Sequence, residues 1–135
     1  MHGITFTPAA LIGFETMLAE KAEPVVDDIA KKLASSDGPV HADETFWTTD
    51  GVRTYFWMHG DEKYIHFQYD TSRAGEVSRN ILGEDFTGTL VTDCHAGYAA
   101  SAAGAKQKCL SHLARTAHDW QKLTEADSID FTFFA

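Results

Sequence analysis

Cysteine and long apolar runs are both scarce in this chain of 135 residues. Only Cys94 and Cys109 are present, too few for a disulfide framework and typical of a reducing cytosol. No apolar run approaches the roughly 20 residues that a membrane-spanning helix needs, and the N-terminus does not have the pattern of a secretory signal. We therefore expect a soluble, cytoplasmic protein that is neither secreted nor associated with a membrane.

Positive charge is the second scarce feature. The chain has 11 Lys and Arg against 20 Asp and Glu, which gives a formal net charge of -9. Proteins that bind nucleic acid non-specifically rely on an excess of basic residues that neutralise phosphates. Any contact with nucleic acid would therefore need positive charge from metal ions or from another domain. Hydrophobic residues make up 44% of the chain, which suits one globular domain or a part of a larger one.

The first part of the chain has the apolar periodicity of helices. Pro8 is typical of a first helical turn, and a second helix is expected to begin at Glu23 and Pro24. The turn-forming sequence SSDGP ends this region. We expect residues 1–36 to form an N-terminal segment of two helices, which leads into a core of residues 37–135.

Within residues 37–135, the period of the apolar residues changes to two, which is typical of strands. Strands are expected around residues 40–43, 52–59 and 63–69. The turn signal Asp50-Gly51 separates the first two, and GDE separates the second from the third. Consecutive strands joined by such short turns form an antiparallel meander.

The second half of the chain alternates between helical and strand patterns. A crossover helix after a meander can place a fourth strand beside the first and parallel to it, with a right-handed connection. The fold class expected is therefore α/β, with a mixed sheet flanked by helices. The elements expected are a helix over 72–82, a strand that ends at Asp93, a helix over 96–103, a short strand at 106–108 and a helix over 109–123.

This strand order would make Asp43 and Asp93 neighbours across the sheet. Two adjacent carboxylates repel each other, so either a proton or a cation must lie between them. Magnesium prefers oxygen ligands and binds through one or two carboxylates plus water and substrate phosphate. The alternative is that both residues cap turns, which is the more frequent role of aspartate at a strand end. Glu44 should point to the opposite face, as a solvated neighbour or a supporting group and not as a ligand.

Four separated motifs carry a resemblance to a known family. The motifs are HADETFW (41–47), DGVRTYFWMH (50–59), SRAGEVSRNILGEDFTGTLVTDCHAGY (72–98) and KQKCLSHLAR (106–115). In this order and at this spacing they resemble the catalytic core of transposases of the insertion sequence 66 family. The leading GITFTPAALIGF is also similar, so the resemblance covers about residues 3–123.

The resemblance implies a ribonuclease-H-like fold and a DDE triad of two Asp and one Glu that holds two magnesium or manganese ions. Asp43 in HADET would be the first acid, and Asp93 in LVTD the second. Cys109 and His112 match a Cys-x-x-His element of several transposase groups. The implied chemistry is cleavage at a transposon end, followed by transfer of that end to target DNA. The implied partners are these two DNAs and other copies of the chain, in a bacterial cytoplasm.

Three departures limit this transfer of function. The third acid of the family lies well downstream of any position available here, and no N-terminal DNA-binding region is recognised. Cys94 and His95 replace the usual glycine and aromatic residue after the second Asp.

Because of these departures, we expect a fragment that is inactive alone. The alternatives are an inactive transposase remnant that serves as a folded or interaction module, or another ribonuclease-H-like nuclease. The acids that come too soon to be the third are Asp119, Glu125, Asp127 and Asp130.

Other candidate features have simpler interpretations. Cys94, His95, Cys109 and His112 could bind zinc, but the adjacent pair does not have the usual ligand gap. In the simpler interpretation Cys109 is buried, and His112 faces the candidate site or donates a hydrogen bond. Arg115 could contact DNA phosphate, although a surface ion pair is more common.

Aromatic residues in the strands could stack on bases, but their spacing indicates the core. The terminal FTFF is expected to be either a strand without its neighbours or an artefact of truncation, and it would promote association if exposed. The strand aromatics in question are Trp47, Phe56, Trp57 and Phe67.

Overall fold

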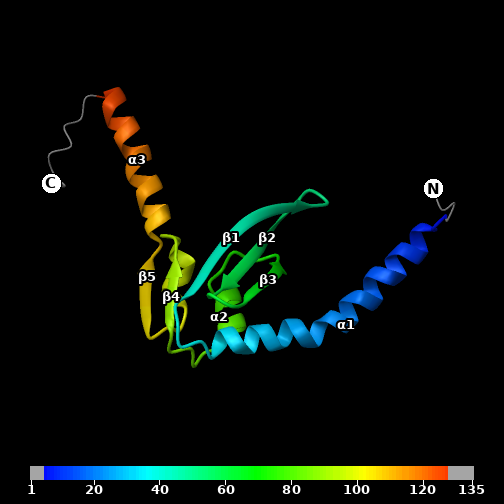
Figure 1. Ribbon diagram of the computed structural model, residues 1–135. Helices are drawn as coiled ribbons and strands as arrows, with labels where there is room; N and C mark the ends of the chain where they lie inside the picture. Colours follow the sequence, from blue (N-terminus) through cyan, green and yellow to red (C-terminus); the bar gives the residue numbers. More distant parts are fainter. Residues whose placement is uncertain (1–4, 128–135) are drawn as a thin grey trace.

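The computed structural model describes residues 5–127 of the chain. A sheet lies at the centre, and two helices, α1 and α3, extend away from it in different directions (Figure 1). The elements, in chain order, are α1 (Pro8–Ala34), β1 (Val40–Thr49), β2 (Val52–Gly60), β3 (Ile65–Asp70), α2 (Glu76–Leu82), β4 (Thr89–Thr92), the 3-10 helix η1 (Ala96–Ala100), β5 (Ala105–Lys108) and α3 (Leu110–Asp127).

The five strands form one mixed sheet in the order β3-β2-β1-β4-β5. The first three strands are an antiparallel meander, and β4 then pairs in parallel with β1. The short β5 pairs in parallel with β4. The predicted mixed sheet is therefore confirmed, including the return of the fourth strand to the side of the first.

The core lies on one face of this sheet, against α2 and the end of α1. The last turns of α1 contribute the fully buried Leu33, and α2 contributes Val77 and Ile81. Trp57 of β2 is also fully buried in this cluster, and its indole nitrogen donates to the carbonyl of Ser72 at 3.0 Å. The other buried hydrophobic residues of the cluster are Val40, Ala42, Leu82, Phe86, Leu90 and Tyr98.

The N-terminal region is one helix, so the prediction of two helices is wrong. Pro24 lies inside α1, where it removes one backbone hydrogen bond but does not end the helix. Apart from Pro24, residues 18–26 contain no glycine, asparagine, aspartate or serine, so no adjacent residue favours a break. Figure 1 shows that α1 changes direction part-way along its length, as expected for a helix with an internal proline.

Three predicted boundaries also differ. Strand β1 continues to Thr49, because it pairs with β2 along its whole length. Helix α2 begins only at Glu76, and the predicted helix over 96–103 is the short 3-10 helix η1. The late start of α2 has a local cause. Asp70 accepts from the backbone of Ser72 at 2.7 Å, and the Ser72 hydroxyl accepts from Ala74 at 3.0 Å, so side chains hold this segment in turns.

The second face of the sheet is largely uncovered by the described residues. Only Trp57 of the four strand aromatics is in the core, so the core assignment of the other three was wrong. The register places them on the side opposite Trp57, where they are exposed together with two residues of β3. We call this surface the open face, and it consists of Trp47, Phe56, Ile65, Phe67 and Tyr69.

Candidate active site

Two aspartates lie just beyond the last paired residues of the parallel strands β1 and β4. The parallel pairing of β1 and β4 ends with His41 opposite Val91. Asp43 comes two residues after His41, within β1, and Asp93 comes two residues after Val91, directly after the end of β4. Because side chains two residues apart along a strand point to the same face, Asp43 lies on the face of His41, and a continuation of β4 by one residue would direct Asp93 to that same side.

Asp43 lies next to the first turn of α3. Its side chain is 47% exposed, and its Oδ2 lies 3.9 Å from Nε2 of His112. Its Oδ1 accepts from the backbone nitrogen of Glu44 at 3.0 Å. The first turn of α3 is held in place because the Cys109 N–H donates to the carbonyl of Thr92, at the end of β4, over 2.7 Å. This bond brings His112 to the end of β4, beside Asp43.

Asp93 forms a turn with the residues that follow it. Its Oδ1 accepts from the backbone N–H of His95 at 2.8 Å. Its carbonyl oxygen accepts from Nζ of Lys108 at 2.8 Å and from the hydroxyl of Thr92 at 2.9 Å. Within residues 5–127 no hydrogen bond reaches its Oδ2, so that oxygen remains available to a ligand.

The Glu44 side chain is buried near these aspartates, so of the two predicted roles the solvated neighbour is wrong and the supporting group agrees with its position. Its side chain is 1% exposed and lies on the face opposite Asp43, as the strand geometry requires. Oε1 accepts from Arg73 at 2.7 and 2.8 Å, and Oε2 accepts from the Tyr98 hydroxyl at 2.5 Å. The pKa of Arg73 is raised, chiefly by the hydrogen bond to Glu44. Both of its oxygens are thus already bonded to side chains of the protein.

All three carboxylates raise the pKa of the Tyr98 hydroxyl. Burial is the largest cause that raises the pKa of Tyr98, and the hydrogen bond and charge of Glu44 come next. The charges of Asp93 and Asp43 raise this pKa further. Three acids from β1 and from the loop after β4 therefore act in the same direction on the pKa of one phenol group.

The donor set fits magnesium better than zinc. Within residues 5–127 no three His, Cys, Asp or Glu side chains come together as ligands of one metal ion. The four-ligand zinc site is therefore absent from this part of the chain, and Cys94 is exposed. Two carboxylates are sufficient for magnesium, which keeps several waters and takes further ligands from substrate phosphates.

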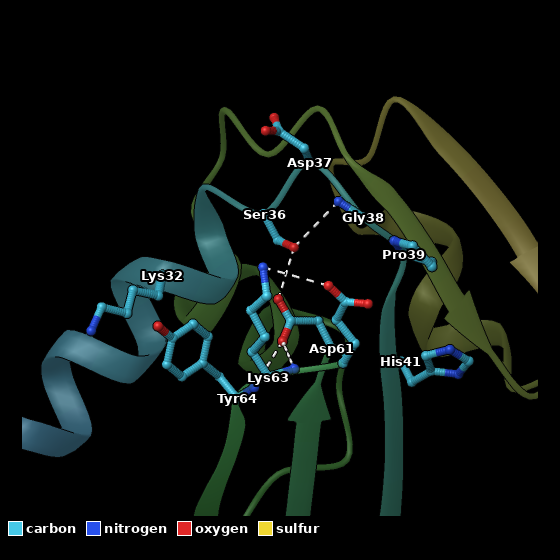
Figure 2. A pocket seen from close by; sticks show the side chains of 10 residues that line it. Lys32, Ser36, Asp37, Gly38, Pro39, His41, Asp61, Lys63 and Tyr64 are labelled. Atoms are coloured by element: carbon cyan, nitrogen blue, oxygen red, sulfur yellow. Dashed lines mark hydrogen bonds and ion pairs between the residues drawn. The ribbon is translucent and has the colours of Figure 1, made fainter.

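A cavity of about 590 Å³ lies away from the two aspartates, near the start of β1 and the β2–β3 turn. Figure 2 shows dashed lines from Asp61 to its neighbours: its carboxylate accepts from the Ser36 hydroxyl at 2.9 Å and from two backbone N–H groups at 2.8 Å. The backbone bonds are the main cause that lowers the pKa of Asp61. Lys32 pairs with Asp28 at 2.6 Å and lies over the ring of Tyr64. Because these groups satisfy one another, the cavity presents no converging set of free ligand groups.

The sequence was compared with known proteins. The model of a family described as "Transposase IS66 family" matches residues 1–131. The chain belongs to the IS66 family of transposases. A search of curated proteins found no match. Membership in a transposase family implies interaction with DNA and, in general terms, a nuclease-type enzyme.

The accessory residues of this IS66-family chain lie at the start of α3. Cys109 is partly buried and its pKa is lowered, first by a hydrogen bond from the backbone of His112 and then by the His112 side chain. Arg115 lies one turn beyond His112 and is exposed. In the described part of the chain it forms no ion pair, so the surface pair considered from the sequence is not found there.

None of the described helices is long and apolar enough to cross a membrane.

Sequence reasoning did not find the partners of Glu44. The sequence nevertheless contained a signal that one acid needs partners. Adjacent acids on a strand point to opposite faces, so one of the two must point to the covered face of the sheet. A carboxylate on a covered face requires a cation and hydrogen-bond donors. Arg73 and Tyr98 supply them here, from segments that are 29 and 54 residues away along the chain.

Proposed function

We propose that this IS66-family chain contributes two acids of a DDE site to metal-dependent cleavage and strand transfer of DNA. The supporting observation is that Asp43 and Asp93 each lie two residues beyond the last pair of two adjacent parallel strands. The strand order β3-β2-β1-β4-β5 supports a ribonuclease-H-like core around them. The proposed partners are transposon-end and target DNA, with other copies of the chain assembled on that DNA.

The role proposed for the two carboxylates is to bind and orient divalent ions, two magnesium or manganese ions in the complete enzyme. Such ions activate a water or hydroxyl and stabilise the leaving oxygen in phosphoryl transfer. They would also offset the net charge of -9, which otherwise repels DNA phosphates. The Asp93 turn keeps one carboxylate oxygen bonded to His95 and leaves the other free to face an ion.

A specific observation favours a second candidate function for the chain alone. Within residues 5–127 no third acid joins Asp43 and Asp93, because Glu44 is held on the opposite face. A site with two acids can bind an ion without completing the reaction. The second candidate is therefore a folded or interaction module that binds metal but does not cut DNA by itself.

Titration with manganese tests the proposed ligands. Asp43→Asn and Asp93→Asn remove charge at nearly constant volume, and each should weaken Mn²⁺ binding to the full chain about tenfold or more. Isothermal calorimetry measures this loss. The control is Asp37→Asn, since Asp37 is an exposed acid in the loop before β1 and should bind Mn²⁺ as the wild type does.

Equal affinity in the wild type, Asp43→Asn and Asp93→Asn would show that the ion lies elsewhere and would contradict the proposal. Cleavage of labelled DNA by the same samples separates the two candidates. Cutting that is lost in both variants supports the enzyme. Metal binding without cutting supports the module.

A further inference from the structure

We propose that Glu44 is a positioning residue that fixes the Asp93 loop relative to Asp43. The Asp93 loop is defined as residues 93–98. The inference rests on the proposed function, in which the two aspartates bind metal. It adds a role for a buried carboxylate that is not itself a ligand.

Glu44 joins three separate parts of the chain. The residue lies in β1, directly after Asp43, so its backbone moves with the first aspartate. Its Oε1 accepts from Nε and Nη2 of Arg73, in the connection from β3 to α2. Its Oε2 accepts from the hydroxyl of Tyr98, in η1. Oε1 also lies 4.0 Å from Nδ1 of His95.

The Tyr98 end of this link leads back to Asp93 through short contacts. The backbone N–H of Tyr98 donates to the carbonyl of His95 at 3.3 Å, and the backbone N–H of His95 donates to the Asp93 carboxylate at 2.8 Å. Tyr98 itself is almost fully buried, and its ring packs edge-on against Trp57 at 5.8 Å. The Asp93 loop therefore has one anchor in the core and one on Glu44.

Close backbone packing couples the Arg73 end to the same loop. A Cβ atom placed on Gly75 would lie 1.8 Å from the carbonyl oxygen of Gly97, so only glycine permits this approach. A Cβ atom on Gly97 would lie 3.3 Å from the carbonyl of Arg73. The two segments that bond Glu44 thus also touch each other, and a shift of one must shift the other.

The energetics favour a stiff link. A carboxylate that is 1% exposed is costly to bury unless a cation and hydrogen bonds compensate. Arg73 and Tyr98 provide both, and charge-assisted bonds of 2.5 to 2.8 Å are the strong class of hydrogen bonds. Movement of the Asp93 loop away from β1 would leave a buried charge with one partner fewer. The network therefore resists the motion that would separate the two aspartates.

Tyr98→Phe and Glu44→Gln test this role in the full chain. Tyr98→Phe removes one hydroxyl and keeps the ring packed on Trp57, so it remains informative if Glu44→Gln does not fold. Both variants should speed amide hydrogen exchange at His95, Gly97 and Tyr98. Both should also weaken Mn²⁺ binding about tenfold, the size expected for a residue that orients ligands.

Ser78→Ala is the matched control. It removes a buried hydrogen bond from the same core, since Ser78 Oγ lies 2.8 Å from Nε2 of His59. A comparable loss of global stability is expected, without faster exchange in the Asp93 loop and without weaker Mn²⁺ binding. This comparison separates positioning from a general loss of stability.

Wild-type Mn²⁺ affinity in Tyr98→Phe, or unchanged exchange in the Asp93 loop, would overturn the positioning role. A wild-type chain that binds no Mn²⁺ would contradict the proposed function instead. In that case the exchange rates alone would still decide whether Glu44 holds the loop.

Discussion

Adjacent residues can take unrelated roles, and Asp43 and Glu44 illustrate this. Asp43 is half-exposed on one face of β1, whereas Glu44 is buried on the other and bonded to Arg73 and Tyr98. The alternation of strand side chains alone produces this difference. The strand pattern predicted the direction of each side chain. It did not predict the burial of Glu44, because that burial depends on the connection from β3 to α2 and on η1, which come later in the chain.

A buried histidine makes the stability of the fold dependent on pH. His59 is fully buried in β2, and burial is the main cause that lowers its pKa from 6.5 to about 4, with a smaller effect of His66. Because the folded pKa is below the unfolded one, the unfolded chain binds more protons between about pH 4 and 6.5. This contribution to stability is therefore complete above pH 6.5 and is lost as the pH falls toward 4.

Denaturant unfolding at pH 7 and pH 4.5 measures this effect. The wild type should lose roughly 2 kcal/mol more than His59→Gln between these two conditions, by the linkage of proton binding to folding. The comparison with His59→Gln removes the contribution of the acids, which titrate in both proteins. An equal loss in both proteins would mean that His59 does not govern this pH range.

Among the elements, α1 departs most from the prediction. Its last turns pack through Leu33, while apolar residues of its first turns, such as Leu11, Phe14 and Leu18, are exposed. The first part of α1 thus depends on local helix stability more than on packing. Pro24 lies inside this helix, where a proline costs about 3 kcal/mol relative to alanine.

Pro24→Ala should stabilise the first part of α1. The substitution restores one backbone hydrogen bond and removes a steric clash, so amide exchange in residues 10–22 should slow and the helical circular dichroism signal should increase. Pro8→Ala is the matched control, because a proline in the first turn gives up only an N–H that has no partner within the helix. Equal effects of both substitutions would argue against a local weakness at Pro24.

At the scale of the whole molecule, the open face departs from an ordinary globular surface. Aromatic residues of β1, β2 and β3 meet there, with ring centroids 6.0 Å apart for Trp47 and Phe56 and 5.6 Å apart for Phe56 and Tyr69. A hollow of about 400 Å³ on this side is lined by Asp43, Phe56 and Phe67, among others. Contiguous apolar surface of this kind promotes association.

Phe67→Lys should therefore reduce self-association of the chain, as measured by sedimentation velocity over a range of concentrations. A charge in the middle of the open face opposes burial of that face against another molecule. Leu123→Lys on α3 is the matched control, since Phe67 and Leu123 are both 65% exposed and Leu123 lies outside the open face. The prediction fails if the two variants associate equally.

The sequence by itself determined most of the strands and the meander, because apolar periodicity and turn residues act over short distances, and the handedness of crossovers predicted the parallel return of the fourth strand. It also identified the family, through motifs that the match over residues 1–131 confirms. Only the tertiary structure decided that α1 continues through Pro24, that Trp57 is buried while Phe67 is exposed, and that Glu44 binds Arg73 and Tyr98. These outcomes depend on which distant segments cover each face of the sheet, and hydrophobic periodicity along a single strand contains no information about that cover.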